Sequence, residues 1–140
     1  VPVAMVQNGY SFWERQAEKP LPAPGGRPLG KANKSGTLDY CLRHRDRIAF
    51  MPHGALGGLK ARDGRRDLAK DFPQLARLAE AKGCSPQALA LAAMRRKWPC
   101  IVHIVGMRNL SRVEELGVAA KLESQLTESE LRIIDVAPTK

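Results

Sequence analysis

Residues 100–116 read CIVHIVGMRNLSRVEEL, a short apolar run followed at once by a basic, polar segment. Ile101 to Val105 are β-branched apart from His103 and too few for a helix, which predicts a buried strand. Gly106 is expected to let the backbone turn close to a ligand, and Asn109 is the expected N-cap of a helix. The run therefore predicts a strand, a glycine turn and a helix in direct succession.

The beginning of this expected helix is suited to hold an anion. Free backbone N–H groups at a helix N-terminus attract negative charge. Arg108 and Arg112 lie one turn apart around it, so that two guanidinium groups can converge on a phosphate. Glu115, on the next turn, is placed to accept a hydrogen bond from a base or a ribose. Taken alone, the segment fits equally well an ordinary strand, loop and helix with two solvated arginines.

Length and composition favour one domain without a membrane span. The chain has 140 residues, 44% of them apolar, and no apolar run approaches the roughly 20 residues of a membrane helix. Its net charge of +9 comes from 23 Lys and Arg against 14 Asp and Glu. Many of the basic residues fall in two loops, at about 18–36 and 57–71, and only 5% of the residues are aromatic. Binding of nucleic acid by base stacking is therefore not expected.

Three cysteines, Cys41, Cys84 and Cys100, give an odd count with wide spacing, which fits neither a disulfide framework nor a zinc site. A reducing cytoplasm is the simplest setting for them. Cys100 and His103 point to opposite faces of a strand, and Cys41 with His44 supplies only two ligands, so we expect no metal site.

Strands alternate with helices along the whole chain. Such alternation predicts parallel strands joined by right-handed crossovers, and hence an α/β protein. In a barrel of eight such units, sites form where the strands end, and phosphate is often held after the last two strands. Strands are expected at about 3–7, 48–51 and 101–105. A first helix is expected at 37–44, a second from Asp71 as N-cap to Gly83, and a third that begins at Ser85 and Pro86. A fourth helix is expected after Asn109, with Val113 and Leu116 facing the core, and a last one begins with a capping box at Thr127 and Glu130.

Four motifs carry a resemblance to a known family. They are VAMVQNGYSFWER (3–15), IAFMPHGALGG (48–58), GCSPQALALAAMRRK (83–97) and IVHIVGMRNLSRVEEL (101–116). In this order and at this spacing they resemble the last three strand-helix units of the aldo-keto reductases. The resemblance implies that residues 1–140 are a C-terminal segment of a (β/α)8 TIM barrel domain, with a flexible insertion at about 18–36. It also implies binding of NADP(H) in an extended form.

The resemblance further implies roles for single residues. Gln7 would hold the nicotinamide carboxamide, and His53 stands where a ring stacks on nicotinamide. His53 replaces the usual Tyr or Trp, Gly54 replaces a common Ser, and Leu116 stands where an Asn usually meets adenine. The remaining implied contacts are Gly54 and Leu56 beside the pyrophosphate, Gly106, Arg108 and Arg112 at the adenosine phosphate, and Glu115 near adenine.

The family's catalytic Asp, Tyr, Lys and His come from the first half of the barrel, which this chain lacks. We therefore expect no catalytic residue here, and Tyr10 is interpreted as a packing residue. The intact enzyme would reduce an aldehyde or ketone to an alcohol with NADPH, whereas this chain alone is expected to be inactive without the N-terminal half of the barrel. The alternatives are a non-catalytic truncated remnant that interacts through open sheet edges and, third, a basic nucleic-acid-binding protein.

Overall fold

Two parallel strands form the sheet of the computed structural model. β1 (Met5–Gly9) pairs along its whole length with β2 (Ala49–His53). The connection between them carries helix α1 (Thr37–Arg43), as a parallel crossover requires. The prediction of an α/β protein with parallel strands is thus confirmed for these two strands. The structure describes residues 2–20, 36–106 and 109–135.

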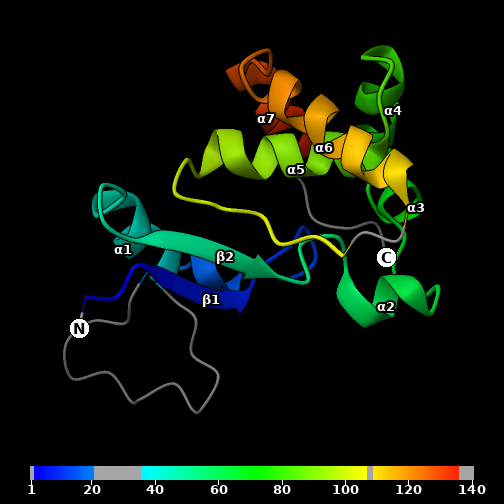
Figure 1. Cartoon of the computed structure of the whole chain (residues 1–140). Coiled ribbons are helices and arrows are strands. Elements are labelled where there is room, and N and C mark those ends of the chain that lie inside the picture. The colour runs from blue at the N-terminus through cyan, green and yellow to red at the C-terminus, as the bar shows by residue number, and fades with distance from the viewer. Residues whose placement is uncertain (1, 21–35, 107–108, 136–140) are drawn as a thin grey trace.

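Helices follow β2 for most of the remaining chain. Helices α4 to α7 gather on one side of the molecule and β1 lies on the opposite side (Figure 1). Helix α5 packs against both α4 and α6, and α4 also contacts α7. The elements besides those above are the 3-10 helix η1 (Gln16–Glu18) and helices α2 (Gly58–Arg62), α3 (Leu68–Asp71), α4 (Pro73–Ala81), α5 (Pro86–Lys97), α6 (Leu110–Glu123) and α7 (Glu128–Ile134).

The third strand, expected over Ile101 to Val105, is reduced to a single parallel bridge between Phe50 and Ile101. The Phe50 N–H donates to the Cys100 carbonyl at 2.8 Å, and the Val102 N–H donates to the Phe50 carbonyl at 2.9 Å. Beyond this point the segment makes no further ladder pairing, so the prediction of a full strand was wrong. The segment still runs along the edge of β2 that faces away from β1, so β2 lies between β1 and this segment.

The two faces of the sheet differ in their environment. Phe50 and Ile101 are fully buried in the core beneath the helices, and Val6 packs against the same core. Alternate residues point to the other face, where Met5 is 49% exposed and Val102 is 40% exposed. Parallel sheets usually have both faces covered. Here the described residues cover one face and leave apolar side chains on the other.

Three helix starts follow the expected capping chemistry. The Ser85 hydroxyl accepts from the Ala88 N–H at 3.1 Å, and Asn109 Oδ1 accepts from the Arg112 N–H at 3.3 Å. Thr127 opens α7 with the complete capping box, since it exchanges hydrogen bonds with Glu130 in both directions. These local predictions are confirmed.

The stretch 57–71, expected as a polar loop, contains the short helices α2 and α3. Asp67 caps α3 by accepting from two backbone N–H groups. Asp71, expected to cap the next helix, instead accepts from the Trp13 indole N–H at 2.8 Å. Helix α4 begins after Phe72 without a side-chain cap.

The residues by which helix α6 faces the core differ in part from those expected. Val113, expected to face the core, is exposed, whereas Leu116 packs against the core. The side chains of α6 that are buried come later, at Ala119 and Leu122. No helix within the described ranges is both long and apolar enough to cross a membrane.

Candidate functional site

Two of the expected cofactor residues lie on neighbouring strands, Gln7 at the centre of β1 and His53 at the carboxyl end of β2. Gln7 pairs with Met51, and His53 follows Met51 by two residues. Because side chains alternate along a strand, Gln7, Met51 and His53 lie on the same face. This is the face that no helix of the described chain covers, and both Gln7 and His53 are exposed on it.

A tight glycine turn follows His53. Gly54 has a left-handed φ of +70°, and its carbonyl accepts from the Gly57 N–H at 2.8 Å. Gly57 has a φ of +94°, and a Cβ there would lie 2.8 Å from the Ala61 Cβ, so only glycine fits. Leu56, between them, is partly buried against the core. The turn therefore presents backbone directly at the strand end, as the family resemblance implies for a pyrophosphate.

The expected phosphate site before α6 is only partly described. Gly106 is exposed without a positive φ, and open space surrounds the position of a Cβ. A side chain would therefore fit at this position, and the expected close approach of the backbone to a ligand stays a prediction. Arg112 is exposed in the first turn of α6 and Glu115 is half-buried. Arg108 lies outside the described residues, as does 21–35 of the expected insertion.

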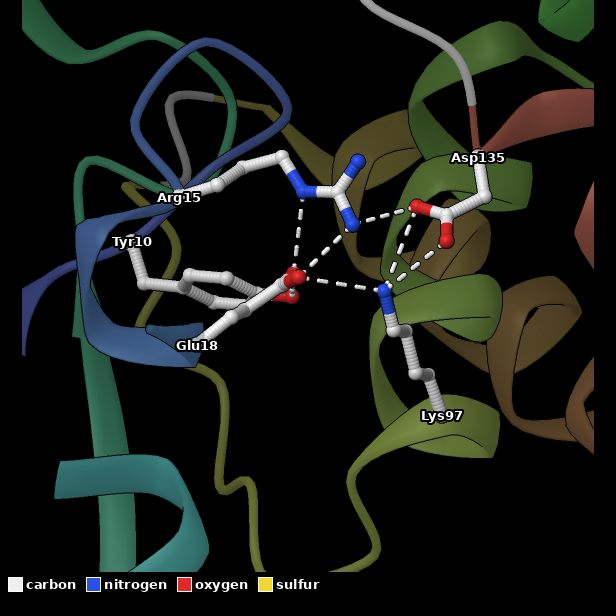
Figure 2. A network of polar contacts seen from close by, with 5 residues as sticks. All are labelled: Tyr10, Arg15, Glu18, Lys97 and Asp135. Atoms are coloured by element: carbon white, nitrogen blue, oxygen red, sulfur yellow. Dashed lines mark hydrogen bonds and ion pairs between the residues drawn. The ribbon is translucent and has the colours of Figure 1, made fainter. Parts of the chain in front are cut away.

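A second group of polar residues, which the sequence did not reveal, lies between the segment that follows β1 and the ends of α5 and α7 (Figure 2). Glu18 accepts from the Tyr10 hydroxyl at 2.5 Å and from Arg15 Nη2 at 2.7 Å. Lys97 Nζ lies 3.1 Å from Glu18 Oε2 and 3.0 Å from Asp135 Oδ2, and Arg15 also pairs with Asp135. Two cations thus bridge two carboxylates. Only the spacing of Arg15 and Glu18 gives a local signal, because Lys97 follows Glu18 by 79 residues.

This polar cluster, defined as Tyr10, Arg15, Glu18, Lys97 and Asp135, shifts the pKa values of Glu18 and Tyr10. Burial disfavours the charged Glu18, but hydrogen bonds from Arg15 and Tyr10 and the charges of Arg15 and Lys97 outweigh it, so the pKa of Glu18 is lowered. Burial, and then the neighbouring Glu18 carboxylate, raise the pKa of the Tyr10 phenol well above its usual value. At neutral pH the cluster therefore holds an ionised Glu18 and a neutral Tyr10.

Tyr10 also has the packing role that the sequence predicted. It is buried, and its ring packs edge-on against Phe50, with ring centroids 6.1 Å apart. Its hydroxyl faces the polar cluster while its ring belongs to the core.

The cysteines and His103 are buried or partly buried, and Cys84 is the most exposed of the three thiols. Cys41 and Cys100 are both buried, and burial raises the pKa of the Cys100 thiol to about 11. His103 Nε2 lies 2.9 Å from the Leu91 carbonyl, and burial lowers its pKa, so the ring is neutral and donates this bond. Among the residues that the structure describes, no three His, Cys, Asp or Glu side chains are arranged to hold a metal ion.

No protein-family model matches this chain, and no curated protein matches it either.

Proposed function

We propose that the chain is the NADP(H)-binding C-terminal part of an aldo-keto reductase barrel, which reduces an aldehyde or ketone once the rest of the barrel is present. The observation that carries the proposal is the placement of Gln7 and His53. They lie on one uncovered face of adjacent parallel strands, and the Gly54 turn directly follows His53 at the carboxyl end of β2. In (β/α)8 barrels this end of the strands is where ligands bind.

The cofactor would meet three kinds of group at this end. The Gln7 amide would hold the nicotinamide carboxamide through hydrogen bonds, and the His53 ring would stack on the nicotinamide. The exposed backbone at Gly54 would approach the pyrophosphate without a side chain between them. Arg108 and Arg112 would pair with the adenosine phosphate, with Gly106, Leu56 and Glu115 completing the contacts. The cofactor would supply the hydride.

The exposed apolar face of the sheet supports the second half of the proposal. Met5 and Val102 point away from the helices, into the space that the interior of a closed barrel would occupy. The N-terminal half of the barrel would cover this face and would bring the catalytic Asp, Tyr, Lys and His. This chain alone would therefore not reduce carbonyl compounds. A reducing cytoplasmic setting, expected from the odd cysteine count, belongs to the same proposal.

The test is a comparison of two cofactors. The chain is combined with the first five strand-helix units of an aldo-keto reductase, and NADPH and NADH are titrated by fluorescence. Replacing Arg108 and Arg112 by Ala removes two charge-assisted contacts of roughly 1.5 to 3 kcal/mol each, so the preference for NADPH should fall at least about tenfold. Arg43→Ala on α1 is the matched control. An equal loss of affinity for NADPH and NADH would contradict the assignment of these arginines to the adenosine phosphate.

A non-catalytic interaction protein is the second candidate, favoured by the same exposed face and by the outer edge of β1, which no described residue pairs with. The two candidates differ in one measurable respect. The interaction protein would bind its partner without any dependence on NADPH, whereas the reductase segment would bind the other half of its barrel more tightly when NADPH is present.

A further inference from the structure

A pocket of about 270 Å³ lies between the loop that follows β1, the end of α5, and α7. Its apolar lining includes Phe12, Met94, Leu131 and Ile134. Pockets for drug-sized ligands span roughly 300 to 1,000 Å³, so this one suits a smaller molecule, such as a single substituted ring. None of the eight residues expected to bind the cofactor lines it, so the inference does not rest on the proposed function.

The charged groups of the pocket leave an excess of positive charge. Four cations line it, Arg15, Arg96, Lys97 and Arg132, against the three carboxylates of Glu18, Glu128 and Asp135. Arg132, at the last turn of α7, forms no ion pair with any residue within the described ranges. A monoanion would therefore neutralise the pocket.

The two carboxylates of the polar cluster are held very differently. Glu18 is 16% exposed and accepts from the Tyr10 hydroxyl and from two nitrogens of Arg15, besides its pair with Lys97. Asp135 is 42% exposed and follows the end of α7, and among the described residues its carboxylate pairs with Arg15 and Lys97 alone. Glu18 is thus a fixed part of the fold, whereas Asp135 lies in an outer position where another carboxylate can replace it.

We propose that this pocket binds a small organic monocarboxylate. The ligand's carboxylate takes the place of Asp135 on Arg15 and Lys97, and its hydrocarbon part lies against Met94 and Ile134. Arg15 and Lys97 already hold a carboxylate in this geometry, as Figure 2 shows, so the ligand needs no rearrangement of the cations. Asp135 acts as an internal competitor that the ligand displaces.

The experiment follows methyl resonances of the 140-residue chain by NMR at neutral pH, with benzoate as the probe. Benzoate should shift the methyl groups of Met94 and Ile134 in a saturable manner, with a dissociation constant in roughly the millimolar range. The methyl group of Met5, on the far face of the sheet, should not move. Benzamide has the same ring without the charge, and inorganic phosphate has the charge without the ring, so both should bind at least about tenfold more weakly.

Two variants test the position of the carboxylate. Asp135→Asn keeps the shape of the exposed side chain and removes the competing charge, so benzoate should bind about tenfold more tightly. Lys97→Gln should weaken benzoate by a similar factor. Asp46→Asn and Lys121→Gln, on the surface away from the pocket, should leave its affinity unchanged.

Each of several results would overturn the proposal. Absence of shifts at Met94 and Ile134, or equal shifts with benzamide, would exclude a carboxylate site. Phosphate binding as tightly as benzoate would exclude the apolar subsite. Unchanged or weaker benzoate binding by Asp135→Asn, a variant of an exposed residue that should fold normally, would show that the ligand does not take the place of Asp135.

Discussion

The Tyr10 hydroxyl donates a 2.5 Å hydrogen bond to Glu18 Oε1 while the Tyr10 ring packs edge-on against Phe50 of β2. The Tyr10 side chain thus connects the hydrophobic core next to β2 with the ion pairs of the polar cluster. Lys97, at the end of α5, reaches the same Glu18 carboxylate. The loop after β1, the sheet and the helical side of the molecule are joined at this point.

Removal of this hydroxyl should destabilise the chain without disturbing its packing. Tyr10→Phe keeps the ring against Phe50 and loses the hydrogen bond to a charged, largely buried acceptor, which should lower the free energy of unfolding by roughly 1.5 to 3 kcal/mol. Urea denaturation measures the change. Tyr40→Phe, at an exposed ring on α1, is the matched control and should change little. Equal effects of the two variants would show that the Tyr10 hydroxyl contributes nothing.

Glu18 should make stability depend on acid pH. Its folded-state pKa is lowered, so its contribution is fully present above the ordinary glutamate pKa of about 4.3 and is lost as the pH falls through the lower folded value. Glu18→Gln should therefore be less stable than wild type at pH 7, and this difference should shrink below about pH 4. Denaturant unfolding at a series of pH values tests this. Glu114→Gln, on the exposed face of α6, should follow the wild-type curve; a constant difference for Glu18→Gln would contradict the linkage.

Two glycines should respond to the same substitution with opposite signs. Gly57 has a left-handed φ and no room for a Cβ, so Gly57→Ala should destabilise the chain by roughly 1 to 3 kcal/mol. Gly117 lies inside α6 with open space around it, so Gly117→Ala should stabilise by up to about 1 kcal/mol. Thermal unfolding of both variants gives the answer. Stabilisation by Gly57→Ala would mean that the turn after Gly54 does not have this conformation.

The uncovered apolar face should make the isolated chain associate. Replacing Val102 and Ile104, both exposed, by Thr should reduce the average mass in solution, measured by light scattering at several concentrations. The control replaces Leu110 and Val113 by Thr; these two residues are apolar and at least as exposed but lie on α6. If the control variant lowers the mass as much as the test variant, association does not proceed through the sheet.

The sequence predicted the features whose causes are local. Ser85, Asn109 and Thr127 were identified as caps because a hydroxyl or amide accepts from a backbone N–H only two or three residues away. The strand at Ile101 to Val105 was predicted from β-branched composition, yet a strand also needs partners, and only Ile101 has one. Composition alone cannot tell whether a neighbouring strand is present.

For the candidate sites, too, the sequence predicted some residues and missed those that meet only through tertiary packing. Gln7 and His53 were named from a resemblance, and the structure puts them on one face of the paired strands, although their contact with a cofactor stays a prediction. The polar cluster was missed because its members come from three distant parts of the chain and meet only through tertiary packing. Asp71 was wrongly predicted as a helix cap. It accepts a hydrogen bond from the Trp13 indole, which is 58 residues away in the sequence, so no local pattern could indicate this contact.

The central position of β2 also sets the order in which the molecule opens. β2 pairs with β1 on one side, and Phe50 bonds to Cys100 and Val102 on the other, so its backbone is held from both directions. Within the part of the chain that the structure describes, β1 is paired on a single side, and residues 102–106 have no further ladder bonds to β2. Fluctuations of the native state therefore begin at the two margins, and amide protons of β2 exchange with deuterium last. If folding follows the reverse order of this opening, β2 forms the nucleus of the sheet, and β1 and Ile101 join it from opposite sides.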